Sequence, residues 1–320
     1  MNFQLLIENL TNPALLFYVL GILAVFFKSD LEIPPNSSKF ISLYLLFAIG
    51  FKGGQELSHE VFSTEIVWSI LFGVAVSALI PLYSFFILKK RFNVYDAGAI
   101  AAAYGSVSAV TFVTAVSYLE MHDMQVHGHM VAIMALMESP AIITGLILIS
   151  IFNGNDEEKI HKSVAVRHSF TNGSVLLILG SLLIGFLADG KQAEGIKPFT
   201  TDLFKGFLAI FLLDMGIASG KKMGAFLSYG LFPILFALLV PLFNGCLVTI
   251  GSSFFIEDPS NRFMFGILAA SASYIAVPAA MKVAVPKANP GTFLPMALAV
   301  TFPFNITIGM PIYYWLASAY

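Results

Sequence analysis

Small polar residues interrupt two apolar stretches at corresponding places in the two halves of the chain. The residues concerned are Gly105, Ser106, Val107 and Ser108 in the first stretch, and Ser271, Ala272 and Ser273 in the second. A helix that stops and restarts at such a point exposes a new N-terminus, whose free N–H groups and partial positive charge suit an anion. Small residues also allow close helix packing, and for either stretch alone packing is the simpler interpretation. Their recurrence in both halves favours a binding site for a small anion.

A single acidic residue lies deep in another apolar stretch. Glu138 falls in the sequence Met137, Glu138, Ser139, Pro140, within the stretch 130–152. An ionisable group inside a membrane span is costly and indicates a functional site by default. Its carboxylate could bind sodium or carry a proton, and Pro140 would free nearby carbonyl oxygens as further ligands. The alternative interpretation is a buried acid that is paired with a hydroxyl.

Oxygen-bearing side chains flank a proline at the equivalent place in the second half. Thr301, Asn305 and Thr307 lie on either side of Pro303, and we predict that they are further sodium ligands. Asp214 is a weaker candidate, because its apolar stretch is short and the residue could instead lie in a vestibule or pair with a lysine.

The predicted site offers an anion no cationic side chain. Lysine and arginine are absent from the stretches 97–119, 130–152, 263–281 and 291–320, so helix dipoles and hydroxyls would have to hold the ligand. Bicarbonate fits, because it donates as well as accepts hydrogen bonds, and so do other small oxyanions. Moving one anion inward against the membrane potential costs about 2.3 kcal/mol per 100 mV, and one co-transported sodium ion cancels that cost.

Histidines form the other concentration of reactive side chains. His122, His127 and His129, with Asp123, could bind a metal on the outer face, but solvated loop histidines are more common, and we expect no metal beyond sodium. The sequence has no HExxH, GxSxG or P-loop motif, and an enzyme would need a second reactive group facing Glu138. We therefore predict that the chain is not an enzyme, that it has no cofactor and that Na⁺ is its coupling ion.

Lipid must surround most of the chain that positions these residues. Hydrophobic residues make up 58% of the 320 residues and charged residues only 11%, with a mean hydropathy of +0.84. Apolar stretches recur at 13–27, 40–51, 66–88, 97–119, 130–152, 174–188, 206–220, 225–256, 263–281 and 291–320. Since about 20 apolar residues of helix cross a bilayer, we predict an all-α polytopic membrane protein of about ten transmembrane helices, the first two of each half being short.

The two halves repeat the same order of short and long stretches. The recurring residues are Gly50 and Gly54 with Gly216 and Gly220, Ser106 and Ser108 with Ser271 and Ser273, and Ala135, Ile142 and Gly145 with Ala299, Ile306 and Gly309. We predict a first repeat at 1–155, a cytoplasmic linker at 156–170 and a second repeat at 171–320. With about five helices in each, the repeats are inverted and the fourth and ninth helices are discontinuous, as in many secondary transporters.

Positive charges indicate the orientation. Most of the 17 lysines and arginines follow the first, third, fifth, seventh and ninth stretches, and cytoplasmic loops retain such residues. We therefore predict an inner (plasma) membrane protein with both termini outside the cytoplasm. A net charge of −2 without a long basic run excludes a nucleic-acid partner.

The ordered set of motifs resembles the SbtA-type sodium-dependent bicarbonate transporters, best known from cyanobacteria, over nearly the full length. The matching segments are residues 49–54, 105–108, 137–141, 288–290 and 301–303. The resemblance implies core and gate domains, a homotrimer and alternating access by an elevator-like shift of the core. It also implies that Na⁺ and bicarbonate bind where the interrupted helices meet, which carries over to Ser106, Ser108, Thr111, Ser271, Ser273 and Glu138.

Departures from the family pattern concern the ligands rather than the fold. The cyanobacterial proteins have aspartate and serine where this chain has Tyr274 and Ala276, and aspartate where it has Glu138. The shorter linker weakens the implied regulation by a PII-like partner. Together, residues and resemblance predict a sodium-dependent symporter of a small inorganic anion, bicarbonate first. The alternatives are another small oxyanion or monocarboxylate as substrate, or a membrane ion sensor without flux.

Overall fold

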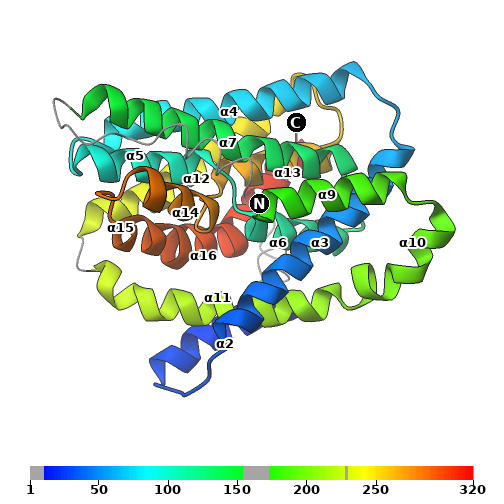
Figure 1. Ribbon diagram of the computed structural model, residues 1–320, viewed down its shortest axis with the longest axis horizontal. Coiled ribbons are helices and arrows are strands. Elements are labelled where there is room, and N and C mark those ends of the chain that lie inside the picture. Colours follow the sequence, from blue (N-terminus) through cyan, green and yellow to red (C-terminus); the bar gives the residue numbers. More distant parts are fainter. Residues whose placement is uncertain (1–10, 154–172, 228–229, 320) are drawn as a thin grey trace.

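The structure is a computed structural model that describes residues 11–153, 173–227 and 230–319 (Figure 1). Every regular element in these ranges is a helix, which confirms the predicted all-α class. In the first half these are α2 (Pro13–Phe26), α3 (Pro35–His59), α4 (Thr64–Leu88), α5 (Val94–Gly105), α6 (Ala109–Glu120) and α7 (Gly128–Phe152). The predicted linker at 156–170 lies outside the described residues.

The second half contains both long helices and short pieces. Its elements are α9 (Gly173–Leu187), α10 (Gly190–Lys197), η1 (Pro198–Asp202), α11 (Phe204–Leu227), α12 (Leu231–Ser252), α13 (Pro259–Ala270), α14 (Ala276–Ala284), α15 (Pro290–Pro295), η2 (Met296–Thr301), α16 (Phe302–Phe304), η3 (Asn305–Gly309) and α17 (Met310–Ala319). The elements η1, η2 and η3 are π-helical turns. Such turns are rare and often accompany functional sites.

Six helical segments of the described chain are long and apolar enough to cross a membrane. They are Thr64–Leu88, Val94–Glu120, Gly128–Phe152, Gly190–Met223, Leu231–Ser252 and Pro290–Ala319, while Pro13–Phe26 and Gly173–Leu187 are shorter apolar helices. The short apolar stretches 40–51 and 206–220 lie within longer helices, since α3 has 25 residues and α11 has 24. The apolar part of α3 ends early because Lys52 and Glu56 lie in its last turns. The total of about ten spans stays a prediction.

Two of the long helices turn broad apolar faces outward. The exposed residues are Trp68, Leu71, Leu79 and Phe86 on α4, and Leu235, Leu239, Phe243 and Leu247 on α12. Their spacing puts them on one face of each helix. A soluble protein rarely exposes so much contiguous apolar surface, but hydrocarbon is a good solvent for it. These faces are therefore suited to contact with lipid.

Glycines make two close helix crossings, of α3 with α9 and of α2 with α11 (Figure 1). A Cβ atom on Gly54 would lie 2.0 Å from the carbonyl oxygen of Leu182 in α9. On Gly216 in α11 it would lie 2.1 Å from the carbonyl oxygen of Tyr18 in α2. Only glycine fits at such distances, and close backbone approach is how helices associate where no hydrophobic effect acts between them.

The other helices build a central body that contains the two broken helices. In it α4 and α7 pack on α5, and α12 and α17 pack on α13. The chain is non-helical between α5 and α6, and again between α13 and α14. Both interruptions predicted from the sequence are thus confirmed.

Candidate functional site

The first break begins where α5 packs against α4. Gly105 ends α5, and a Cβ atom there would lie 2.2 Å from Cγ of Pro81, so no larger residue fits. Ser106 is extended, with φ −82° and ψ 175°. Ser108 then caps α6, because its Oγ accepts a hydrogen bond from the backbone N–H of Thr111 at 3.2 Å. A serine cap satisfies one of the N–H groups that a helix start leaves unpaired.

The second break is similar, although the N-cap of α14 is Ile275, which makes no side-chain cap bond. Helix α13 ends at Ala270, and Ser271 is extended. The Ser273 Oγ accepts a hydrogen bond from the N–H of Val277 at 3.3 Å, in the first turn of α14. Each broken helix therefore restarts next to a serine that binds its first turn.

The two breaks are bonded to each other. The N–H of Ser108 donates to Ser271 Oγ at 3.0 Å, and the N–H of Ser273 donates to the carbonyl of Ala103 at 2.8 Å. Ser108, Ser271 and Ser273 are all buried, and hydrogen bonds in such low-dielectric surroundings are strong. The prediction that the two breaks meet is confirmed.

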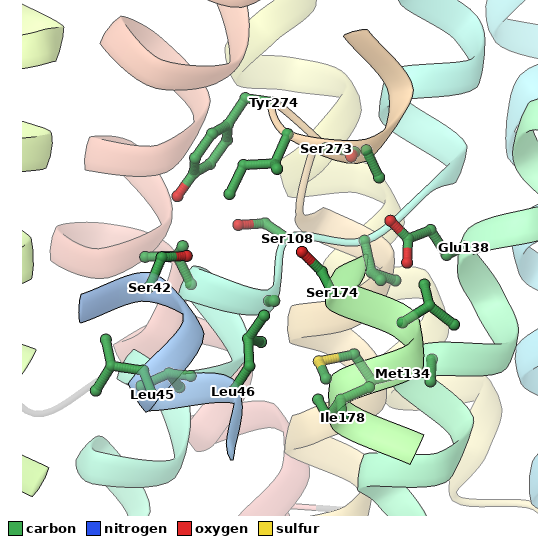
Figure 2. A pocket seen from close by; sticks show the side chains of 18 of the residues that line it. Ser42, Leu45, Leu46, Ser108, Met134, Glu138, Ser174, Ile178, Ser273 and Tyr274 are labelled. Carbon is green, nitrogen blue, oxygen red and sulfur yellow. The ribbon is translucent and has the colours of Figure 1, made fainter. Parts of the chain in front are cut away.

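A cavity of about 50 Å³ lies where the breaks face α3, α7 and α9 (Figure 2). Its wall includes residues 107–110 at the start of α6 and residues 273–276 at the start of α14. The first turn of a helix leaves N–H groups unpaired and carries a partial positive charge, so both restarts present anion-binding ends to one space. A single water needs about 10–15 Å³ on the same measure, so a few waters or small ions fit.

Glu138 on α7 supplies the carboxylate of the lining. Figure 2 shows it near Ser273, Ser108 and Ser174, with Leu45, Leu46, Met134 and Ile178 farther down. Pro140 lies inside α7 and has no N–H to bond the carbonyl one turn earlier, in the turn that carries Glu138. Carboxylate, hydroxyl and freed carbonyl oxygens are the ligands that transporters offer to Na⁺.

Only part of the predicted site borders the cavity. The predicted residues in its lining are Val107, Ser108, Ser273 and Glu138. Those not in its lining are Gly105, Ser106, Thr111, Ser271 and Ala272. Several of these serve the breaks themselves, as Ser271 does by binding Ser108. The Ser106 hydroxyl is buried and has no hydrogen-bond partner among the described residues.

The three candidates near Pro303 are engaged within the protein. Thr301 Oγ1 donates to the carbonyl of Ala237 at 2.8 Å, and Asn305 Nδ2 donates to the carbonyl of Ala270 at 2.7 Å. Thr307 Oγ1 donates at 2.6 Å to a carbonyl of its own helical turn. None of the three lines the cavity beside Glu138, so the structure does not bring them together with it.

Two lining hydroxyls were missed by the sequence analysis. Ser42 on α3 and Ser174 on α9 border the cavity, but each is a lone serine in an apolar stretch and belongs to no motif. Their position follows from the crossing of α3 with α9, which the sequence pattern did not show. Asp214 is not in the lining, and its carboxylate accepts a hydrogen bond from Ser38 Oγ.

Comparison with known families decides what kind of protein this cavity belongs to. A family model described as the Na⁺-dependent bicarbonate transporter superfamily matches residues 13–318, which include both breaks and Glu138. The chain belongs to this superfamily. A search of curated proteins gave no match. The superfamily is one of transporters and not of enzymes, which confirms the prediction made from the motifs.

For a member of the Na⁺-dependent bicarbonate transporter superfamily, the charge of the cavity is informative. Among the described residues, its lining contains Glu138 but no lysine, arginine or histidine. A carboxylate repels an anion about 4 Å away by about 4 kcal/mol at an effective dielectric constant of about 20. A cation between the two charges replaces that repulsion with two attractions. The cavity therefore favours an anion only when a cation accompanies it.

Proposed function

We propose that the protein is a symporter that moves bicarbonate together with Na⁺ through the cavity between the two breaks. The observation that carries this proposal is that the starts of α6 and α14 and the carboxylate of Glu138 line one cavity. Helix starts attract the anion and the carboxylate attracts the cation. Family membership supports both ions as substrates.

The anion is held, in this proposal, by backbone N–H groups at the starts of α6 and α14 and by the hydroxyls of Ser108 and Ser273. Both hydroxyls border the cavity while binding a helix start. Bicarbonate accepts hydrogen bonds at its oxygens and donates one from its own hydroxyl, so it can use N–H donors and serine acceptors together. Val107 lines the same cavity, whereas Ser106, Ser271 and Ala272 belong to the breaks and do not border it.

Sodium is held, in this proposal, chiefly by Glu138. Ser174 brings a second oxygen into the same lining, and the turn around Pro140 offers a carbonyl. Thr111, Thr301, Asn305 and Thr307, which the sequence predicted as sodium ligands, do not line this cavity, so in this proposal they do not hold the Na⁺ that Glu138 binds.

Two inverted repeats of about five helices each are the architecture we propose. In such a repeat α3 corresponds to α11 and α9 to α2, so the α3–α9 crossing is the counterpart of the α2–α11 crossing. The recurring glycines support this, since Gly50 and Gly54 pack on α9 while Gly216 and Gly220 pack on α2.

Transport would proceed by an elevator-type movement. The cavity lies at a boundary, with the breaks and Glu138 on the central body and Ser42 and Ser174 on the α3–α9 pair. Sliding of the body along this pair would carry both ions across while the pair stays fixed. A homotrimer in an inner membrane, with both termini outside the cytoplasm, would anchor the fixed part, and a PII-like regulator would act from the cytoplasmic side.

The test is flux in liposomes. Purified protein is reconstituted, and uptake of labelled bicarbonate is measured in alkaline buffer, which limits loss as CO₂, with an inward gradient of Na⁺ or of K⁺. Accumulation is expected with Na⁺ only. Equal uptake under both gradients would refute the coupling, and Na⁺-dependent anion binding without accumulation would identify a sensor. Competition by formate, nitrate, sulfate and acetate identifies the preferred anion.

A further inference from the structure

Three potential metal ligands gather away from the transport cavity, where α3 ends and α7 begins. Glu60 follows the last residue of α3, His127 precedes α7, and His129 lies in the first turn of α7. One ligand atom from each residue lies within 4.8 Å of the others. Nothing in the proposed transport of bicarbonate uses these three residues.

The cluster is already tied together through Glu60. One carboxylate oxygen accepts a hydrogen bond from the N–H of Gly128 at 2.6 Å, and the other lies 2.7 Å from His129 Nδ1. This carboxylate therefore joins α3 to the start of α7. The Glu60 oxygen and His129 Nδ1 face each other, so they are the pair of atoms that one metal ion could share.

One ring nitrogen of His129 has no partner. The His129 side chain is only 5% exposed, and its Nε2 has no hydrogen-bond partner among the described residues. The two ring nitrogens point to opposite sides of the ring, so an ion shared with Glu60 would bind at Nδ1, and Nε2 would keep the ring proton.

His127 is the exposed member of the cluster, and its polar contacts are long. Its side chain is 45% exposed. Its Nδ1 lies 3.3 Å from Asn261 Nδ2, and its Nε2 lies 3.9 Å from a carboxylate oxygen of Asp258, so neither contact fixes the ring tightly. Asp258 immediately precedes α13, which makes it a candidate fourth ligand.

We propose that Glu60, His127 and His129 form a binding site for a divalent transition-metal ion, for which Zn²⁺ is the best probe. Two imidazoles and a carboxylate are a ligand set that Zn²⁺ accepts, with a fourth position for water or for Asp258. Bonds of about 2.0–2.2 Å place tetrahedral ligand atoms about 3.3 Å apart. The ligand atoms of the cluster lie within 4.8 Å of one another, so they must move closer together to bind the ion.

A metal at this position would join the α3–α9 pair to the central body. Glu60 belongs to α3, whereas both histidines belong to the start of α7, so a shared ion would oppose sliding between them. Zn²⁺ should therefore slow Na⁺-driven bicarbonate uptake. This consequence rests on the proposed transport function, whereas the binding itself does not.

Zn²⁺ binding is measured on purified, tag-free, full-length protein by competition with a chromophoric chelator. One saturable site per chain is expected, and His127→Ala, His129→Ala and Glu60→Gln should each weaken it by about ten-fold or more. His122→Ala is the matched control, because His122 lies in the same segment but bonds the Tyr118 carbonyl at 2.9 Å. No saturable binding, or equal loss in His122→Ala, would overturn the site.

Folding and function are controlled separately. His127→Ala removes an exposed side chain, so it should keep the wild-type melting temperature in the absence of metal and lose the upward shift that Zn²⁺ gives the wild type. In liposomes, Zn²⁺ should inhibit uptake by the wild type but not by His127→Ala. Inhibition that is equal in both would refute the regulatory role, while the chelator assay reports on the site even if no anion moves.

Discussion

The segment around Glu138 and the segment around Pro303 place a proline among oxygen-bearing side chains, yet they are built differently. Helix α7 stays α-helical through Pro140, and Glu138 borders the cavity. The second segment passes from η2 through α16 to η3, and the Thr301 hydroxyl and the Asn305 amide are bonded inside the protein. The carboxylate of the first segment thus borders the cavity, whereas polar side chains of the second segment are bonded within the protein.

The two segments differ because the polar side chains of the second provide hydrogen-bond partners for buried groups of the broken helices. Thr301 Oγ1 lies 2.7 Å from the hydroxyl of Tyr104, a fully buried residue of α5, and Asn305 Nδ2 satisfies the last carbonyl of α13. Buried polar groups must find partners, and these two side chains provide them for the broken helices. Glu138 borders the cavity instead, and in our proposal its charge is available to a cation.

The largest expected effect is that of Glu138→Gln. The amide keeps the shape but removes the charge, and losing a charged interaction of about 3 kcal/mol corresponds to about a 100-fold loss. We expect Na⁺-driven bicarbonate uptake in liposomes to fall by that factor.

Two further variants make this result specific. Glu138→Asp retains the charge and should keep measurable Na⁺ dependence, and Glu194→Gln on the exposed α10 should behave as the wild type. If Glu138→Gln takes up bicarbonate as the wild type does, the Glu138 carboxylate does not bind the coupling cation, and the contrast between the two segments is wrong.

A smaller effect is expected from replacing Ser108 and Ser273, whose hydroxyls bond the first turns of α6 and α14. Ser108→Ala and Ser273→Ala each remove a hydroxyl from the cavity and a bond to a helix start, a change worth about 1 kcal/mol. The apparent affinity for bicarbonate should weaken by about five- to ten-fold in each variant.

Ser106→Ala is the matched control for both. Its hydroxyl is buried without a partner among the described residues and does not border the cavity, so the affinity should not change. If Ser106→Ala weakens the apparent affinity for bicarbonate as much as Ser108→Ala does, the anion binds on the other side of the first break.

Features of the fold that depend on local composition could be predicted from the sequence. Apolar stretches predict helices in lipid, and Gly105 and the serines around it predict a break, because both signals lie within a few residues. The sequence was not sufficient to separate Glu138 from Thr301, Asn305 and Thr307. Which oxygen faces a cavity depends on partners far away in the sequence, such as Ala237 for Thr301.

The same limit applied to the cluster at the end of α3. The histidines near residue 127 were visible in the sequence, but Glu60, which lies 68 positions before Gly128, was not recognised. His122 and Asp123, their neighbours in sequence, are not part of that cluster. Proximity along the chain was a poor guide where a loop brings together the ends of different helices.

The smallest effect on ion binding is expected from Thr301→Val, which is also the sharpest test of the comparison. Valine keeps the volume but removes the partner of the Tyr104 hydroxyl, and leaving that group unpaired should lower the free energy of unfolding by about 1–3 kcal/mol. The expected result is a lower melting temperature with less than about a two-fold change in apparent Na⁺ affinity. Thr114→Val, which loses only a 2.9 Å bond to its own helix, should change neither quantity much. If Thr301→Val instead keeps its melting temperature and weakens Na⁺ binding by about ten-fold, its hydroxyl is an ion ligand, and the second segment binds a cation as the first does.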